Sequence, residues 1–403
     1  MTREEVYSEC LTKLEKSNFL LLELATGMGK SKQAIDIINY LVETKYQGKH
    51  TSMLLLVAKT VHKQTWKDEF KKWGGINVDE LTIECYESLK KHEYESFDFV
   101  VMDECHHLHS DKRLDLFSTL TYGNVIGLSA TIPEKLKQYF QYEYAAEVVT
   151  CSIVDAIEDE VLPEPQIILY PLQLDNVNPT ESIEINPKAK GKTYYGNYNE
   201  LWKYRKMKVH AIISCTPRQR VNEYNSQILY EKNRYMRTKQ DFLKNIWLFD
   251  CGERIKYLAN LKNNIVLSIL QRLEKERTIT FCKTIEQADI LGKYSIHSKN
   301  KDSDIIYNSF NAKKINHIVS VNVLNEGANL VDCKYAVFAN YSSSEICSAQ
   351  RVGRSLRHKS PVIILPYYEA TREEKIVNTM IESFKEESIH TIHSLKELDK
   401  FIQ

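Results

Sequence analysis

A glycine-rich segment followed by lysine and serine is the strongest chemical signal in this 403-residue sequence. Residues 24–31, Leu-Ala-Thr-Gly-Met-Gly-Lys-Ser, leave an apolar run and open a helix-length segment, which is the setting of a phosphate-binding loop. Gly27 and Gly29 let backbone N–H groups curl around phosphate oxygens, Lys30 brings positive charge to the β and γ phosphates, and the Ser31 hydroxyl can ligate magnesium. An ordinary strand-to-helix turn is the alternative. The candidate nucleotide-binding residues are Thr26, Gly27, Met28, Gly29, Lys30 and Ser31.

Two adjacent carboxylates, Asp103 and Glu104, follow the apolar run 97–102. If that run is a central strand of a parallel sheet, they lie at the carboxyl edge, where α/β proteins bind ligands. Asp103 can hold Mg²⁺ through its water shell, and Glu104 can orient and deprotonate an attacking water. An acid pair after a strand can also be a solvated loop. The phosphate loop upstream in the same predicted sheet favours catalysis.

The histidines at 106, 107 and 109 lack the spacing of a zinc site, because there is no second ligand cluster and no C-x-x-C pair. We expect His106 to belong to the hydrolysis motif, and His107 and His109 to be structural or solvent-facing. The nine cysteines are odd in number and scattered, so we expect reduced structural thiols.

Basic residues late in the chain can act on the same phosphates. On a helix begun by the serines at 342–344, Gln350, Arg354 and Arg357 fall on one face. Two guanidinium groups presented by a second domain can stabilise the charge developing on a transferring γ-phosphate once the domains close. We therefore assign catalytic roles to these three residues. A basic helix bound to surface acids is the alternative.

The elements that must position these residues form two sets of short apolar runs that alternate with helix-length segments. The first set is 19–24, 52–58, 81–86, 97–102 and 124–129, with helices at 31–44 and 60–73; the second is 277–281, 317–321, 335–340 and 361–366, with helices at 285–291 and 344–356. This rhythm predicts an α/β protein with two parallel-sheet domains. The Pro-punctuated linker at 161–165 predicts a first domain of 1–162 and a second of 163–403.

A basic, aromatic-rich insertion, expected to be helical, interrupts the second domain between about 178 and 245. The strand rhythm disappears there, and helices are predicted after Pro217. Residues 188–244 hold fourteen Lys or Arg and four acids, which suits phosphate neutralisation combined with base stacking. Charged helices that pack aromatic undersides on a core are the alternative. The candidate contacts are Lys203, Arg205, Lys206 and Lys208.

Taken together, these motifs resemble the DExH branch of helicase superfamily two, whose members are nucleic-acid-stimulated ATPases built from two RecA-like domains. Ser129-Ala130-Thr131 looks like the family motif that couples hydrolysis to strand movement, and 326–330 and 350–357 are similar to the fifth and sixth motifs. The resemblance implies coupling roles for His106, Ser129 and Thr131. It also places Gly327 and Asn329 beside ATP, although relatives often carry aspartate at the latter position.

The resemblance also implies where nucleic acid is held. Its candidate contacts in the first domain are Lys59, Thr60, Gln64 and Tyr86, and its candidate in the second is Asn322. Trp66 lies in the same segment and is expected to be core rather than ligand.

Similarity to restriction-type and phage branch-migration motors implies an ATP-dependent translocase or helicase that uses ATP and Mg²⁺, favours DNA over RNA and moves 3′ to 5′. An RNA helicase, or a duplex translocase that does not separate strands, is the nearer alternative. An ATP-gated nucleic-acid sensor or scaffold is the alternative from another class.

Two absences complete the expectations. Relatives commonly read adenine with a glutamine upstream of the phosphate loop, and the first twenty residues contain none; we therefore expect relaxed discrimination among nucleoside triphosphates, with Arg3 and Tyr7 as possible substitutes. No apolar run approaches the 18 residues of a membrane helix, and the formal net charge is zero. We expect a soluble monomer in the cytoplasm, that of the host if the source is viral or phage, with no accessory domain.

Overall fold

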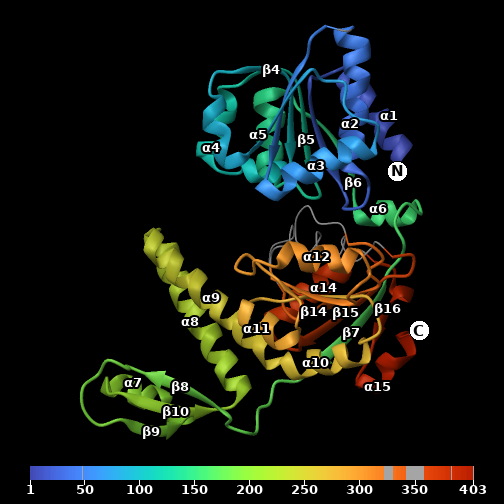
Figure 1. The fold of residues 1–403 in the computed structure, drawn as a ribbon. Coiled ribbons are helices and arrows are strands. Elements are labelled where there is room, and N and C mark those ends of the chain that lie inside the picture. The colour runs from blue at the N-terminus through green and yellow to red at the C-terminus, as the bar shows by residue number, and fades with distance from the viewer. Residues whose placement is uncertain (48, 322–329, 342–357, 383, 403) are drawn as a thin grey trace.

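The computed structural model contains two parallel-sheet domains and a projecting insertion (Figure 1). The structure describes residues 1–403 except 48, 322–329, 342–357, 383 and 403. None of the helices in these described ranges is long and apolar enough to cross a membrane. The described cysteines are all free thiols, as expected.

The first domain is a parallel sheet in the order β3-β2-β4-β5-β1-β6. Its strands are β1 (Phe19–Leu24), β2 (Ser52–Val57), β3 (Glu80–Cys85), β4 (Ser96–Asp103), β5 (Thr121–Ser129) and β6 (Glu147–Cys151). Its helices are α1 (Arg3–Leu14), α2 (Lys30–Leu41), α3 (Thr60–Lys72), α4 (Asp111–Ser118) and α5 (Glu134–Tyr144). The strands are apolar because both faces are covered: Leu20 and Leu22 pack into one core cluster, and Phe19 and Leu21 into the other.

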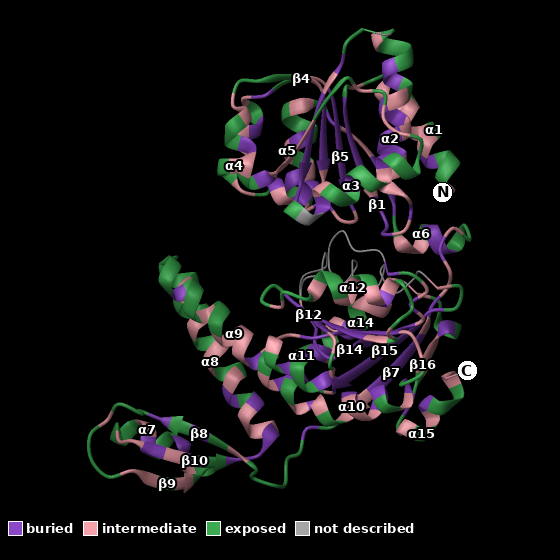
Figure 2. Ribbon diagram, in the orientation of Figure 1, coloured by how far each residue is buried: buried purple, intermediate pink, exposed green. Residues whose placement is uncertain are grey.

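The second domain has a parallel sheet in the order β12-β13-β11-β14-β15-β7-β16. Its strands are β7 (Gln166–Leu172), β11 (Thr278–Phe281), β12 (Ser295–Ile296), β13 (His317–Ser320), β14 (Tyr335–Phe338), β15 (Val362–Tyr368) and β16 (Ile389–Thr391). Its helices are α10 (Asn263–Arg272), α11 (Ile285–Leu291), α12 (Ser303–Asn311), α14 (Arg372–Ile381) and α15 (Leu395–Leu398). Figure 2 shows the strands of both sheets as the most continuously buried elements. The two RecA-like parallel-sheet domains that the sequence predicts are therefore confirmed.

The short helix α6 (Ile153–Glu158) and a linker connect the two sheets. The predicted domain boundary after Leu162 lies between β6 of the first sheet and β7 of the second. β7 pairs with β15 from Gln166 opposite Val362, so the chain enters the second sheet before the insertion and completes it afterwards.

The insertion is only partly helical, which corrects the sequence prediction. Its first half forms a small mixed sheet of β8 (Glu181–Ile185), β9 (Tyr194–Asn197) and β10 (Ala211–Cys215), with α7 (Leu201–Met207) beside it. These strands were missed because they alternate polar and buried residues: in β8 only Ile183 and Ile185 are buried, so no continuous apolar run marks them.

The second half of the insertion is helical, as predicted. α8 (Pro217–Thr238) and α9 (Asp241–Leu261) form a two-helix arm that projects from the second domain (Figure 1). Thr216 and Gln219 form a capping box at the start of α8, with Pro217 in the first turn, an arrangement that favours a helix beginning there.

Candidate ATP-hydrolysis site

A cavity of about 720 Å³ in the first domain brings the predicted nucleotide-binding and catalytic residues together. The phosphate loop lines one part of it, from Thr26 to Ser31, and Asp103 and Glu104 line another. The start of α1 and the length of α3 complete the walls. The β1 and β4 carboxyl ends therefore converge as the motifs predicted, because parallel strands end at one edge of the sheet.

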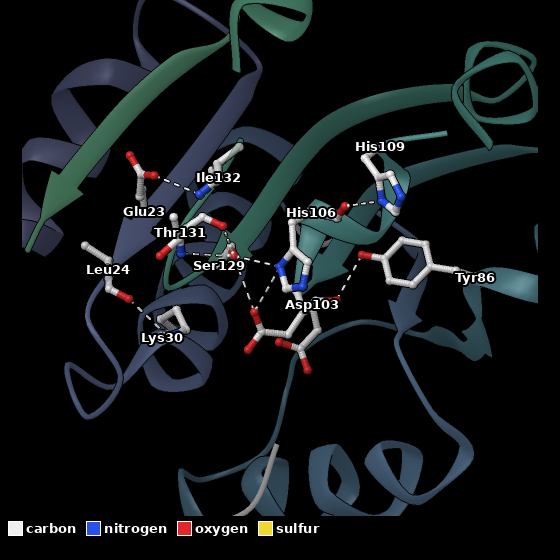
Figure 3. Close-up of polar contacts among 11 residues, drawn as sticks. Glu23, Leu24, Lys30, Tyr86, Asp103, His106, His109, Ser129, Thr131 and Ile132 are labelled. Atoms are coloured by element: carbon white, nitrogen blue, oxygen red, sulfur yellow. Dashed lines mark hydrogen bonds and ion pairs between the residues drawn. The ribbon is translucent and has the colours of Figure 1, made fainter. Parts of the chain in front are cut away.

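The phosphate loop has a backbone that requires its glycines. Gly27 and Gly29 have φ of 104° and 84°, in the left-handed region that side chains disfavour. A Cβ on Gly27 would lie 2.8 Å from the end of the Leu162 side chain, so a larger residue would also require that side chain to shift. Lys30 donates from Nζ to the Leu24 carbonyl at 3.0 Å (Figure 3), which holds its ammonium inside the loop.

Two buried rings position Asp103 at the end of β4. Trp66 Nε1 donates to Asp103 Oδ2 at 2.8 Å, and the Tyr86 hydroxyl donates to the Asp103 carbonyl at 2.9 Å. Trp66 is 3% exposed and Tyr86 is 2% exposed. The expectation that Trp66 is core is confirmed. Tyr86, in contrast, was predicted to touch nucleic acid; it is buried in this structure, and that contact stays a prediction.

The next residue, Glu104, has a strained backbone. Its φ is 53° and its ψ is 56°, a left-handed conformation that costs a non-glycine residue about 1 kcal/mol or more. The side chain is also buried, at 5% exposure. Strain of this kind at a residue facing a ligand cavity is typical of functional sites, and here it turns the carboxylate into the cavity.

Glu104 is connected to the predicted coupling residues by short polar contacts, and Figure 3 shows two of these residues, Ser129 and His106, beside each other. Ser129 Oγ lies 3.3 Å from Glu104 Oε2 and 3.0 Å from His106 Nδ1, and His106 Nδ1 lies 3.5 Å from the same carboxylate oxygen. The Thr131 N–H donates to Ser129 Oγ at 3.2 Å, and its carbonyl accepts from that hydroxyl at 2.8 Å. A hydroxyl carries one proton, so it can donate to Glu104 or to Thr131, not to both at once.

The oxygen donors in the cavity fit magnesium. Ser31 and Asp103 line the same space, and Mg²⁺ prefers hydroxyl, carboxylate and phosphate oxygens, with only one or two protein ligands. In the ranges that the structure describes, no group of three or more His, Cys, Asp or Glu residues could hold a metal.

The remaining predicted contacts of the first domain lie at the same sheet edge. Lys59 precedes α3 as its N-cap residue and Thr60 begins it, and both are exposed. Gln64 is exposed one turn later and donates to Asp68 at 2.9 Å. The carboxyl end of β2 presents these side chains, and their contact with nucleic acid stays a prediction.

Six of the predicted residues of the second domain lie outside the described residues. They are Asn322, Gly327, Asn329, Gln350, Arg354 and Arg357. The described strands that precede them in the chain, β13 and β14, are neighbours of β11 in the second sheet. Their catalytic and binding roles stay predictions.

The four basic residues predicted in the insertion do not share one environment. Arg205 forms an ion pair with the buried Glu223 of α8, and Lys203 pairs with Glu200 at 3.2 Å. Lys206 and Lys208 are exposed. Arg205 therefore ties α7 to the arm, and Lys206 and Lys208 are the better candidates for a phosphate contact.

Three positioning contacts were missed by sequence reasoning. Trp66 holds Asp103 across 37 positions, Arg3 donates to the Gly27 carbonyl at 3.1 Å, and Gln33 donates from Nε2 to the Arg3 carbonyl at 2.8 Å. The sequence offered a signal only for Gln33: it lies three residues after Lys30, and residues three apart share a helix face, so its side chain could have been expected beside the phosphate loop.

Sequence comparisons match each domain to a known family. Residues 2–134 match the model of the type III restriction enzyme res subunit, and residues 261–359 match the helicase conserved C-terminal domain. The "Putative ATP-dependent RNA helicase QP509L" of African swine fever virus is 29% identical over 131 residues, which are 27% of this chain and 24% of that protein. The "Type I restriction enzyme EcoAI endonuclease subunit" of Escherichia coli is 27% identical over 185 residues, 39% of this chain and 22% of that protein. The matches thus span less than a quarter of these relatives.

Solved structures show the same fold at low identity. S. cerevisiae Dbp5 bound to RNA and ADP BeF3 aligns with a TM-score of 0.58 at 11% identity, over 99% of this chain and 92% of that one. The ATP-dependent type ISP restriction-modification enzyme LlaBIII bound to DNA aligns with a TM-score of 0.56 at 13% identity, over 100% of this chain and 32% of that one. With a family match in each domain and this tandem RecA-like fold, the chain is a superfamily 2 helicase-type ATPase related to restriction-type enzymes.

Proposed function

We propose that this ATPase is a translocase or helicase that acts on DNA and moves 3′ to 5′. The observation that carries the proposal is the contact of Glu104 with Ser129 and His106. The residue placed to activate water is thereby bonded to the segment that resembles the coupling motif. Movement of that segment can change the position of the carboxylate, which links hydrolysis to conformational change.

The residues of the cavity divide the work of hydrolysis. Lys30 leaves the Leu24 carbonyl to meet the β and γ phosphates, and Glu104 orients the attacking water and takes its proton. Ser31 and Asp103 would hold Mg²⁺, which supplies charge neutralisation to the phosphates when bound. Trp66 fixes the Asp103 carboxylate, so that it need not reorganise during the reaction. In this proposal Arg354 and Arg357 complete the site from the second domain.

The preference for DNA is supported by the kind of family that the first domain matches. Restriction enzymes act on DNA, and both the res-subunit match and the EcoAI relative fall in that class. The viral relative, described as an RNA helicase, favours RNA as the second candidate substrate.

An ATPase panel tests the proposal. Purified protein is assayed with single-stranded DNA, duplex DNA, forked DNA and RNA, and displacement of a labelled strand and of a protein road-block is measured in parallel. We expect DNA to stimulate turnover more than RNA does, and Glu104→Gln to lower kcat by about 100-fold or more while nucleotide binding persists. Stronger stimulation of ATP turnover by RNA than by DNA would favour RNA as the substrate. Activity independent of every nucleic acid would refute both.

The panel also separates a motor from an ATP-gated sensor. A motor displaces a road-block or a strand during turnover, with a 3′ to 5′ preference on tailed substrates. Stimulated hydrolysis without any displacement would favour the sensor or scaffold.

A further inference from the structure

Gln33 lines the nucleotide cavity, and among the described residues its side-chain amide has a hydrogen-bond partner at Nε2 but none at Oε1. The side chain is 5% exposed and lines the cavity with Arg3 and Tyr7. Its Nε2 donates to the Arg3 carbonyl at 2.8 Å. Its Oε1 is buried and has no hydrogen-bond partner in the described part of the chain. Buried acceptors are almost always satisfied in folded proteins, so this oxygen calls for a donor from outside the described chain.

The amide cannot turn over to present its NH₂ group instead. A flipped amide would set Oε1 against the Arg3 carbonyl, and two acceptors repel. The backbone of Arg3 is itself fixed, because it begins α1, where Thr2 and Glu5 form a capping box. The Arg3 guanidinium also donates to the Gly27 carbonyl at 3.1 Å. The orientation of the Gln33 amide is therefore fixed, and Oε1 is its acceptor without a partner in the described ranges, at the cavity wall.

The place of Gln33 indicates which part of a nucleotide supplies the donor. It follows Lys30 by three residues on α2, so it lies on the same helix face, about 4.5 Å further along the axis. Phosphate oxygens at the loop carry no N–H. Arg3 and Tyr7, which line the cavity beside Gln33, present a planar guanidinium and a phenol ring, and flat groups of this kind suit a base rather than a sugar.

We infer that Gln33 Oε1 accepts an N–H from the exocyclic amino group of the bound nucleobase, and so selects ATP over GTP. Adenine carries an amino donor at position 6, where guanine carries a carbonyl acceptor. Guanine would therefore set its oxygen against Oε1, and the locked amide could not adapt. The inference rests on the proposed use of this cavity by ATP. It opposes the expectation of relaxed nucleotide discrimination, which followed from the missing upstream glutamine.

Equilibrium binding separates this inference from the motor proposal. Dissociation constants of the Glu104→Gln protein are measured for ATP, GTP and purine riboside triphosphate, which is ATP without its 6-amino group. We expect ATP to bind about 10- to 100-fold more tightly than either of the others, the usual range for a buried acceptor left without its donor. Equal affinity for ATP and purine riboside triphosphate would overturn the inference whether or not the protein moves on DNA.

A substitution then assigns the discrimination to Gln33. In the Glu104→Gln background, Gln33→Leu should weaken ATP binding to the level of purine riboside triphosphate, whose own affinity should change less than threefold. If Gln33 only clamps α1 to α2, all three nucleotides weaken by the same factor and their ratios persist, which would overturn the inference. The three dissociation constants of the Glu104→Gln protein remain decisive even if the Gln33 variant does not fold.

Discussion

At the scale of single residues, the proposed general base Glu104 is positioned by its own backbone and by contacts with neighbouring side chains. Glu104 combines a left-handed backbone, a buried side chain and two polar neighbours. Ser129 is fully buried beside it, and its hydroxyl has more acceptors than protons. Movement of Glu104 or of Thr131 would therefore change which oxygen receives the hydroxyl proton of Ser129.

Removal of the Ser129 hydroxyl should therefore change the position of the Glu104 carboxylate without removing a contact to the phosphates. We expect Ser129→Ala to lower nucleic-acid-stimulated kcat by about 10-fold, the worth of one hydrogen bond to a charged group, and to lower strand or road-block displacement by a larger factor. Steady-state turnover and displacement are measured on the same preparation. Ser118→Ala, at an exposed serine, is the matched control. Equal losses of turnover and displacement would contradict the coupling role.

A second residue-scale prediction concerns the stability of the second domain at low pH. Desolvation lowers the pKa of His317 to about 4, and Thr280 Oγ1 lies 3.0 Å from its Nε2. The unfolded histidine takes up its proton near pH 6.5, whereas the folded one resists until about pH 4. The stability that this group contributes is therefore complete above pH 6.5 and falls between pH 6.5 and 4, by no more than about 3 kcal/mol.

Denaturant unfolding at a series of pH values measures this loss. His317→Gln should flatten the dependence between pH 6.5 and 4, and His50→Gln, at an exposed histidine, should leave it unchanged. An unaltered slope in His317→Gln would show that other groups carry the acid sensitivity.

At the scale of elements, the insertion is joined to the arm by a specific ion pair. Arg205 of α7 meets Glu223 of α8, whose side chain is almost fully buried. A buried pair of this kind is costly to break from one side, because the remaining charge stays desolvated. The ion pair gives Arg205 a structural role and leaves the exposed Lys206 and Lys208 for contact with a partner.

Charge reversal of those lysines tests contact with nucleic acid. The double variant Lys206→Glu with Lys208→Glu should weaken DNA binding. It should also reduce the slope of log affinity against log salt by about 1 to 2, because binding with fewer phosphate contacts releases fewer counterions. Titrations between low and physiological salt measure both quantities. Lys396→Glu with Lys400→Glu makes the same charge change at exposed lysines near the C-terminus, and its slope should match the parent. Identical slopes in both double variants would exclude the insertion contact.

At the scale of the whole molecule, hydrolysis is proposed to need both domains. The described cavity lies in the first domain, and the predicted arginines belong to the second. A triphosphate held by Lys30 can meet Arg354 and Arg357 only if the domains approach each other.

Distance measurements between the domains test this closure. Labels are placed at Tyr94 in the first domain and Ile305 in the second, which are 79% and 65% exposed. The distance between the two labels should decrease when a non-hydrolysable ATP analogue and DNA are added. The shift should diminish in Arg354→Ala with Arg357→Ala. A label pair within the first domain, at Tyr94 and Tyr142, should not respond. No shift in the parent protein would refute the closure mechanism.

The sequence by itself determined the features that depend on short segments. Buried strands such as β1 and β4 are continuous apolar runs, and the phosphate loop and acid pair follow them directly, so pattern and motif coincide. The strands β8 to β10 escaped this reasoning because their alternating pattern is weak over four or five residues. The family resemblance rested on the order of such motifs and was confirmed.

Only the tertiary structure decided which distant side chains hold the site. Trp66 against Asp103, Ser129 against Glu104 and Gln33 against Arg3 are contacts between separate elements, and Leu162 reaches the phosphate loop from beyond the first sheet. Local patterns select helices and strands through backbone geometry, but a hydrogen bond between elements depends on packing that brings its two atoms within about 3 Å. That packing is a property of the folded chain as a whole, which no short segment contains.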